Sequence, residues 1–224
     1  MNIVYCVTEN YIEKIKPSIR SLRDHNKCNI SVITESKEVD IDDVKVINIS
    51  GQEYFTPRNC VNYFNMFTYI GLLKVFYPTL LKYDKVIHLD ADTIVNDSLE
   101  DMWNIDLKDK WFAMVPEYKG VYRPFGEKYW NAGVMVLNLK QMRKDGIEEE
   151  MAEYLRTVRQ PWCEQDAFIK FGLMYDKIVD LPIRFNENMV TGYTENPAII
   201  HYCSVGDWWT NRNMQRVEYL DRYR

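Results

Sequence analysis

Strand-like and helix-like segments alternate through the first 95 residues of this 224-residue chain, and this alternation predicts an α/β fold. Hydrophobic residues make up 46% of the chain and charged residues 27%, which is typical of a folded globular protein. A chain of this length can form one domain with a substantial core. We therefore expect a single Rossmann-like domain over residues 1–224, whose mixed, mainly parallel sheet is flanked by helices.

In the first half, short β-branched runs predict strands, and apolar residues at helical spacing predict helices. The expected strands cover residues 3–7, 29–34, 44–49 and 85–89. The expected helices cover residues 11–23 and 62–81, interrupted by Pro17 and Pro78 respectively.

The second half is less regular. Strands are expected at residues 111–115 and 134–139, with short strand-like pieces at 177–180, 183–185 and 198–202. Helices are expected at residues 147–158 and 166–173, and a polar terminal helix at 211–223.

Charge and cysteine content exclude several classes of protein. A net charge of −5 disfavours a general nucleic-acid surface. The five cysteines are dispersed, which disfavours a disulfide framework and a zinc site and favours a reducing compartment.

The chain enters an apolar strand without a basic leader and has no membrane-length apolar run, so we expect a cytoplasmic protein. Four arginines near its end leave room for peripheral membrane contact: Arg212, Arg216, Arg222 and Arg224.

The most informative segment is the run VIHLDADT at residues 86–93. Its apolar part predicts a buried strand, and Asp90 and Asp92 follow at the carboxyl end, where open α/β sheets bind ligands. Ions such as Mg²⁺ take one or two carboxylates together with substrate phosphates. Taken alone, the pair fits a solvated turn as well as a metal-diphosphate site.

Four further clusters have both a functional and a structural interpretation. Val7, Thr8, Asn10 and Tyr11 could hold a nucleotide base or cap a helix. Asn131, Ala132 and Gly133 could contact a sugar closely or form a turn before a strand. Glu164, Gln165 and Asp166 could position a sugar or serve as an acidic first helical turn. His201, which ends an apolar run, could complete a metal site or be a buried structural histidine.

In this order and combination, the motifs resemble those of the family 8 glycosyltransferases, retaining enzymes that include glycogenin and bacterial lipo-oligosaccharide galactosyltransferases. The resemblance covers nearly the whole chain. It implies a fold of the glycosyltransferase A type, with residues 1–95 as a nucleotide-binding half and residues 96–224 as a sugar and acceptor half.

The resemblance also implies a role for each matching residue. The residues expected to bind the nucleotide are Val7, Thr8, Asn10, Tyr11, Lys74, Asp90 and Ala91. The residues expected to bind the sugar are Glu117, Asn131, Ala132, Gly133, Gln165 and Asn186. The metal ligands would be Asp90, Asp92 and His201, and the catalytic segment Glu164, Gln165 and Asp166.

The implied reaction is transfer of a hexose, with glucose or galactose favoured, from a UDP-sugar to an acceptor hydroxyl on a glycan, lipid-linked sugar or protein. Mn²⁺ or Mg²⁺ would be the cofactor. Two residues depart from the family pattern. Asp207 stands where a phosphate-contacting lysine is common, and Glu164 stands where aspartate is usual.

Two alternatives stay open at this point. Asp90-Ala91-Asp92-Thr93 also fits haloacid-dehalogenase-type phosphatases, in which the first aspartate is a covalent nucleophile. The acid at Asp207 would also suit a catalytically idle sugar-nucleotide binder.

Overall fold

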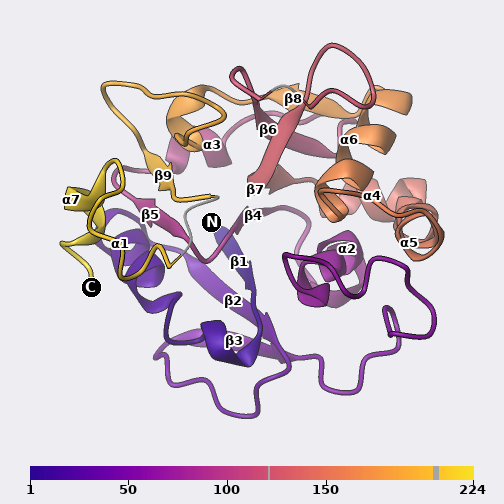
Figure 1. The fold of residues 1–224 in the computed structure, drawn as a ribbon, viewed down its shortest axis with the longest axis horizontal. Helices are drawn as coiled ribbons and strands as arrows, with labels where there is room; N and C mark the ends of the chain where they lie inside the picture. The colour runs from indigo at the N-terminus through magenta and orange to yellow at the C-terminus, as the bar shows by residue number, and fades with distance from the viewer. Residues whose placement is uncertain (121, 204–206) are drawn as a thin grey trace.

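A seven-stranded mixed sheet forms the centre of the computed structural model, which describes residues 1–120, 122–203 and 207–224. Its strand order is β3-β2-β1-β4-β7-β6-β8 (Figure 1). The strands are β1 (Asn2–Cys6), β2 (Asn29–Thr34), β3 (Val44–Asn48), β4 (Val86–Leu89), β6 (Phe112–Pro116), β7 (Trp130–Leu137) and β8 (Ile178–Asp180). A second, two-stranded sheet pairs β5 (Thr93–Val95) with β9 (Ile199–His201).

Helices cover both faces of the large sheet. The α-helices are α1 (Lys16–His25), α2 (Tyr77–Leu80), α3 (Glu100–Trp103), α4 (Leu139–Asp145), α5 (Ile147–Thr157), α6 (Glu164–Met174) and α7 (Val217–Leu220). The 3₁₀ helices are η1 (Glu9–Tyr11), η2 (Tyr69–Phe76) and η3 (Ile183–Phe185).

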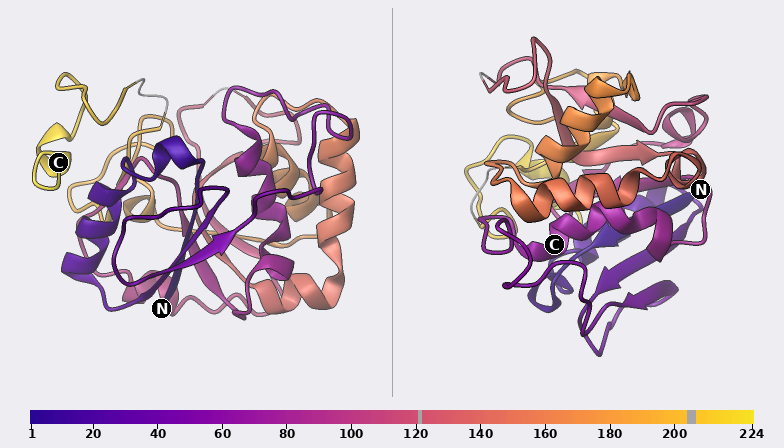
Figure 2. Two further views of the ribbon diagram at one scale, coloured as in Figure 1. Left: turned by 90° about the horizontal axis from the view of Figure 1, so that it is seen from below. Right: turned by 90° about the vertical axis from the view of Figure 1, so that its right-hand side faces the viewer.

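Alternate side chains of each strand enter two separate cores, because neighbouring residues of a strand point to opposite faces. In β1, Val4 packs in the core beneath η2, α2, α4, α5 and α6, whereas Tyr5 packs in the core beneath α1 and α3. Figure 2 shows α5 and α6 gathered on one side of the sheet, with α1 on the other. The expected α/β fold is therefore confirmed.

The direction of β7 determines where the functional residues meet. It runs antiparallel to β4 and pairs Leu89 with Val134, while β1 runs parallel to β4. Asp90 N donates to Gly133 O at 2.7 Å just beyond this pairing. The ends of β1 and β4 and the start of β7 therefore lie together at one edge of the sheet.

The small sheet brings a late segment of the chain to the same edge. Its register places His201 of β9 opposite Thr93 of β5, and Tyr202 N donates to Asp92 O at 2.8 Å. The C-terminal segment, yellow in Figure 1, then passes beside α1, where Arg20 Nη1 donates to Tyr223 O at 3.1 Å.

Most expected strands of the sheet are confirmed to within a few residues, but several other expectations were wrong. Pro17 lies in the first turn of α1 rather than interrupting a helix, since the first helical N–H groups need no intrahelical partner. The helix expected over residues 62–81 begins at Tyr69, because Asn65 accepts from Phe67 N and Thr68 adopts a φ of 81°.

In the second half, residues 183–185 form a 3₁₀ turn instead of a strand. Only Val217–Leu220 is helical within the expected helix 211–223. The preceding polar residues bond locally, as when Asn211 Oδ1 accepts from Asn213 N at 2.9 Å. Asn131, Ala132 and Gly133 lie within β7 rather than in a turn before it. Among the described residues, every helix falls short of the length and apolar character needed to cross a bilayer.

The packing of α6 on the sheet yields a stability prediction. Phe168 is fully buried, with its ring centre 5.0 Å from that of Phe112. Phe168→Ala should lower the free energy of unfolding by about 3–5 kcal/mol, measured by urea denaturation, because it opens a cavity beside the sheet. Leu173→Ala, on the same helix but 38% exposed, should cost about 1 kcal/mol or less. Equal losses in the two variants would contradict this account of the core.

Candidate metal and ligand site

A cavity of about 620 Å³ lies at the edge of the sheet where β1, β4 and β7 meet. It is lined by residues at the ends of β1 and β4, the start of β7, η2, the start of α6 and the C-terminal segment. Most of the expected site residues line it, namely Val7, Thr8, Tyr11, Lys74, Asp90, Ala91, Asp92, Glu117, Asn131, Ala132, Gly133, Glu164, Gln165 and His201.

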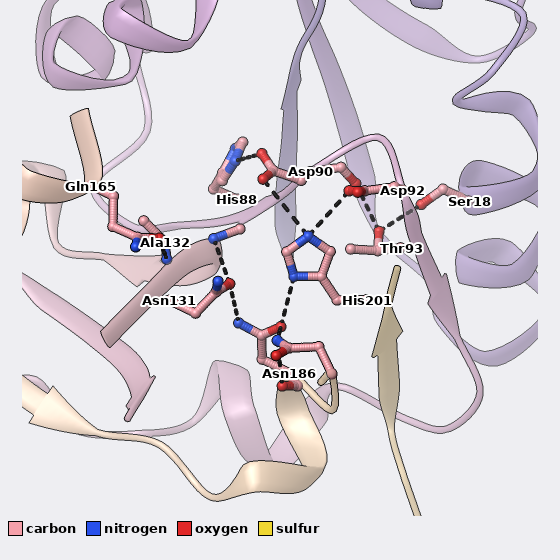
Figure 3. Close-up of polar contacts among 12 residues, drawn as sticks. Ser18, His88, Asp90, Asp92, Thr93, Asn131, Ala132, Gln165, Asn186 and His201 are labelled. Carbon is pink, nitrogen blue, oxygen red and sulfur yellow. Dashed lines mark hydrogen bonds and ion pairs between the residues drawn. The ribbon is translucent and has the colours of Figure 1, made fainter. Parts of the chain in front are cut away.

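Asp90, Asp92 and His201 form a cluster that could hold a metal ion, because one ligand atom from each lies within 4.8 Å of the others. His201 Nε2 is 3.1 Å from Asp92 Oδ1 and 3.9 Å from Asp90 Oδ2 (Figure 3). Two carboxylates and an imidazole are a donor set that Mn²⁺ accepts, and Mg²⁺ accepts the carboxylates readily. The donor set therefore fits the implied ion.

Buried amides fix the orientation of His201. Its Nδ1 is 2.9 Å from Asn186 Oδ1, and Asn186 Nδ2 donates to Asn131 Oδ1 at 2.9 Å (Figure 3). An amide oxygen only accepts, so Nδ1 carries a proton, and when the ring is neutral the lone pair of Nε2 faces the cluster. Burial would lower the pKa of His201, but the neighbouring carboxylates of Asp92 and Asp90 raise it above its ordinary value.

Gly133 makes room for this cluster. A Cβ at this position would overlap the His201 ring and lie 2.8 Å from Asp90 Oδ2. Any side chain on this residue of β7 would therefore displace a ligand of the cluster. The need for glycine here is a matter of space and not of a left-handed φ, although the pairing of β7 with β6 is irregular between residues 131 and 135.

Two side chains, Lys74 and His88, contact the same carboxylate oxygen of Asp90. Its Oδ1 accepts from Lys74 Nζ at 2.8 Å and lies 2.9 Å from His88 Nε2. Although burial opposes ionisation, Lys74 and His88 keep the pKa of Asp90 well below its usual range. Burial and the nearby Lys74 ammonium lower the pKa of His88 to about 4, so this imidazole is neutral near pH 7.

Lys74 joins the metal cluster to the start of α6. It is 4% exposed, and its Nζ also lies 3.1 Å from Glu164 Oε1 at the start of α6. Burial would lower the pKa of Lys74, but Asp90 and Glu164 raise it. Within the part of the chain that the structure describes, Glu164 Oε2 is buried without a hydrogen-bond partner, which leaves it available to a ligand hydroxyl.

Polar groups beside Glu164 also face the cavity. Gln165 Oε1 accepts from Ala132 N at 2.8 Å, which ties the start of α6 to β7. Glu117 Oε1 lies 3.4 Å from Asn131 Nδ2, and burial raises the pKa of this carboxyl group. These side chains can exchange hydrogen bonds with the hydroxyls of a bound sugar.

Three expected site residues do not line the cavity. Asp166 is fully buried and accepts from Tyr129 Oη at 2.7 Å and from Trp162 N at 2.9 Å. Asn186 is also fully buried and supports His201 instead. Asn10 is exposed and hydrogen-bonds with Thr8 Oγ1.

Aromatic side chains line both ends of the cavity, and sequence reasoning assigned no ligand role to most of them. Tyr11 and Trp209 pack edge to face at one end, with Lys14 Nζ over both rings at 4.2 and 3.7 Å. Phe67 and Trp162 pack at 5.6 Å at another part of the wall. No short motif marks Phe67 and Trp162, which come from segments far apart in the sequence.

His88 and Tyr77 were also missed as neighbours of the metal cluster. The sequence spacing could have identified His88 as a neighbour of Asp90. Residues two apart in a strand point to the same face, and His88 precedes Asp90 by two. Tyr77 lies in a separate helix and carried no such signal. Asp207, the acid in place of a lysine, does line the cavity, whereas residues 204–206 of the same loop lie outside the described residues.

A family model described as Glycosyl transferase family 8 matches residues 2–212. Among curated relatives, a putative glycosyltransferase of Haemophilus influenzae is 24% identical over 93% of this chain and 73% of its own length. Glycosyltransferase GlyD of Streptococcus pneumoniae is 23% identical over 97% of this chain, which spans only 30% of that protein.

Solved structures agree on the fold. Galactosyltransferase LgtC in complex with donor and acceptor sugar analogs superposes with a TM-score of 0.72 at 21% identity, covering 100% of this chain and 95% of that one. An active-site mutant of LgtC has a TM-score of 0.76 at 19% identity, with the same coverage. At this identity the likeness supports the fold alone, and it confirms the expected glycosyltransferase A type.

The space that Gly133 leaves predicts a loss of metal binding on substitution. Gly133→Ala should weaken Mn²⁺ affinity, measured by isothermal titration calorimetry, by about tenfold or more, because the new Cβ displaces His201 and Asp90. Gly51→Ala is the control, since its Cβ would meet no atom within 4 Å and the residue does not line the cavity. Unchanged Mn²⁺ affinity in folded Gly133→Ala would contradict the assignment of the cluster.

Proposed function

The chain belongs to glycosyl transferase family 8, and from this premise we propose that it transfers a hexose from a UDP-sugar to an acceptor hydroxyl with retention of anomeric configuration. One observation carries the proposal: the Asp90–Asp92–His201 cluster lines the same cavity as Lys74, Glu164 and Gln165. A metal-diphosphate site formed by this cluster would lie beside groups suited to sugar hydroxyls. Glucose and galactose are the favoured hexoses.

Asp90, Asp92 and His201 would hold Mn²⁺ or Mg²⁺, which when bound supplies a Lewis acid that stabilises negative charge on a diphosphate leaving group. Lys74 is the one cationic side chain among the described cavity-lining residues, which also include five carboxylates. Those carboxylates are Asp90, Asp92, Glu117, Glu164 and Asp207. A bound ion would therefore add most of the positive charge available to a diphosphate, with Lys14 beside Tyr11 and Trp209 as a further cation.

The nucleotide would lie over the end of β1. Val7, Thr8 and Ala91 line the cavity there, and Tyr11 offers an aromatic ring to a base. Asn10 acts on this site through its hydrogen bond to Thr8. In this proposal residues 1–95 form the nucleotide-binding half of a single catalytic domain, and residues 96–224 form the sugar and acceptor half.

The transferred sugar would contact Glu117, Asn131, Gln165 and the backbone at Ala132 and Gly133. The buried Glu164 carboxylate would accept a sugar hydroxyl at its unpartnered oxygen. Asp166 does not touch ligand in this proposal. It positions the segment before α6 through Trp162 N and Tyr129 Oη.

The acceptor would approach along the wall formed by Phe67, Trp162 and Tyr122. The ring centres of Trp162 and Tyr122 lie 6.4 Å apart, and all three side chains line the cavity. Aromatic faces pack well against the apolar face of a sugar ring. A glycan, a lipid-linked sugar or a glycosylated protein can each supply such a ring.

The family match sets aside the phosphatase alternative, which rested on a short acidic pattern alone. The idle-binder alternative is tested by turnover. Incubation with a panel of UDP-sugars and Mn²⁺ should release UDP, in excess over enzyme, from at least one of them. UDP binding without release from any donor would instead support the idle binder.

The metal role predicts the effect of one substitution. Asp92→Asn should lower Mn²⁺-dependent UDP release by at least about 100-fold, because it removes a charged ligand of the ion. Asp101→Asn, an exposed aspartate on α3, is the matched control and should retain full activity. Undiminished UDP release by folded Asp92→Asn would rule out this metal site.

The aromatic wall predicts a selective loss. Trp162→Ala should raise the KM for a sugar acceptor by about fivefold to tenfold, while Mn²⁺-dependent hydrolysis of the UDP-sugar by water stays unchanged. Tyr118→Ala removes a 70% exposed tyrosine that does not line the cavity and should change neither quantity. An unchanged acceptor KM in Trp162→Ala would place the acceptor elsewhere.

A further inference from the structure

We propose that His88 and Tyr77 are positioning residues, which hold Asp90 in the orientation that directs its free oxygen at the metal. This inference rests on the proposed metal site, but it assigns a role to two residues that touch neither metal nor sugar. Both are fully buried, and neither lines the cavity.

The contacts form a chain that begins in the core. Tyr77 Oη lies 3.0 Å from His88 Nδ1, and His88 Nε2 lies 2.9 Å from Asp90 Oδ1. An ionised carboxylate only accepts hydrogen bonds, so His88 Nε2 carries the proton that it donates. In the neutral imidazole Nδ1 is then an acceptor, and the Tyr77 hydroxyl donates to it. Each group thus selects the tautomer and orientation of the next.

The two oxygens of Asp90 have different surroundings. Oδ1 receives both Lys74 Nζ, at 2.8 Å, and the His88 ring. Oδ2 points toward the cluster, 3.9 Å from His201 Nε2, and lies above the space left by Gly133. Hydrogen bonds that saturate one carboxylate oxygen orient the other toward a metal, as outer contacts of metal ligands commonly do.

Lys74 alone cannot define this orientation. Its ammonium is shared with Glu164 and lies in the wall of the cavity, so a bound ligand competes for it. His88, by contrast, belongs to a central strand, paired with Val4 of β1 on one side and Met135 of β7 on the other. Tyr77 approaches it from the core beneath α2. The histidine is therefore the fixed donor of the pair.

The experiment measures Mn²⁺ affinity by isothermal titration calorimetry on metal-free protein, with the melting temperature as a check on folding. His88→Leu keeps much of the volume and removes the donor, so affinity should fall by about 10- to 100-fold. His88→Gln keeps a donor near the place of Nε2 and should recover part of that loss. Tyr77→Phe should give a smaller loss, because the ring of His88 remains but its tautomer is no longer selected.

The matched control is Tyr83→Phe, which removes the hydroxyl of a partly buried tyrosine that contacts Ser31 Oγ at 3.4 Å outside the cavity. It should bind Mn²⁺ like the wild type. If His88→Leu does not fold, Tyr77→Phe decides the matter by itself, since it deletes a single hydroxyl.

A second readout separates positioning from a merely structural role. In the His88 and Tyr77 variants the Mn²⁺ concentration for half-maximal UDP release should rise, while the rate at saturating Mn²⁺ should largely recover. Wild-type Mn²⁺ affinity in folded His88→Leu, or in Tyr77→Phe if that variant alone folds, would overturn the inference and leave the proposed function standing. Failure of the wild type itself to bind Mn²⁺ would overturn both.

Discussion

The site is organised around one electrostatic constraint: a carboxylate at the end of a buried strand needs charge and hydrogen-bond partners. Lys74 and His88 meet this need at one oxygen of Asp90, which leaves the other directed toward Asp92 and His201. Because Lys74 also reaches Glu164, the same compensation ties the metal cluster to the wall where we propose the sugar binds. The charge balance of the Asp90 cluster and the wall of the proposed sugar site therefore share a single buried ammonium.

The direction of β7 also determines which residues meet at the site. With β7 antiparallel to β4, Asn131, Ala132 and Gly133 arrive at the edge where β4 delivers its acidic pair. The small β5–β9 sheet brings His201 there from more than a hundred residues further along the chain. Gly133 allows these segments to meet, since a side chain at this position would occupy the space of the His201 ring.

Patterns within short segments predicted the strands and the acidic pair well, because apolar periodicity and β-branching act locally. They failed over residues 62–68, where an asparagine side chain bonds the backbone and ends the helical pattern early. They also assigned ligand contacts to Asp166 and Asn186, and the structure places both side chains outside the cavity lining, fully buried against Trp162 N and His201 respectively. A residue beside a motif can face either the cavity or the core, and its position in the sequence does not say which.

By itself the sequence determined the α/β class, the strand that leads to Asp90, and the residue types able to hold a divalent cation, because each follows from local composition and spacing. Only the tertiary structure decided which groups meet. It placed His88 and Tyr77 behind Asp90, Asn186 behind His201, and Asp207 on the cavity wall. The physical reason is that strand order, strand direction and loop packing set contacts between distant residues, and these depend on the whole core rather than on any single segment.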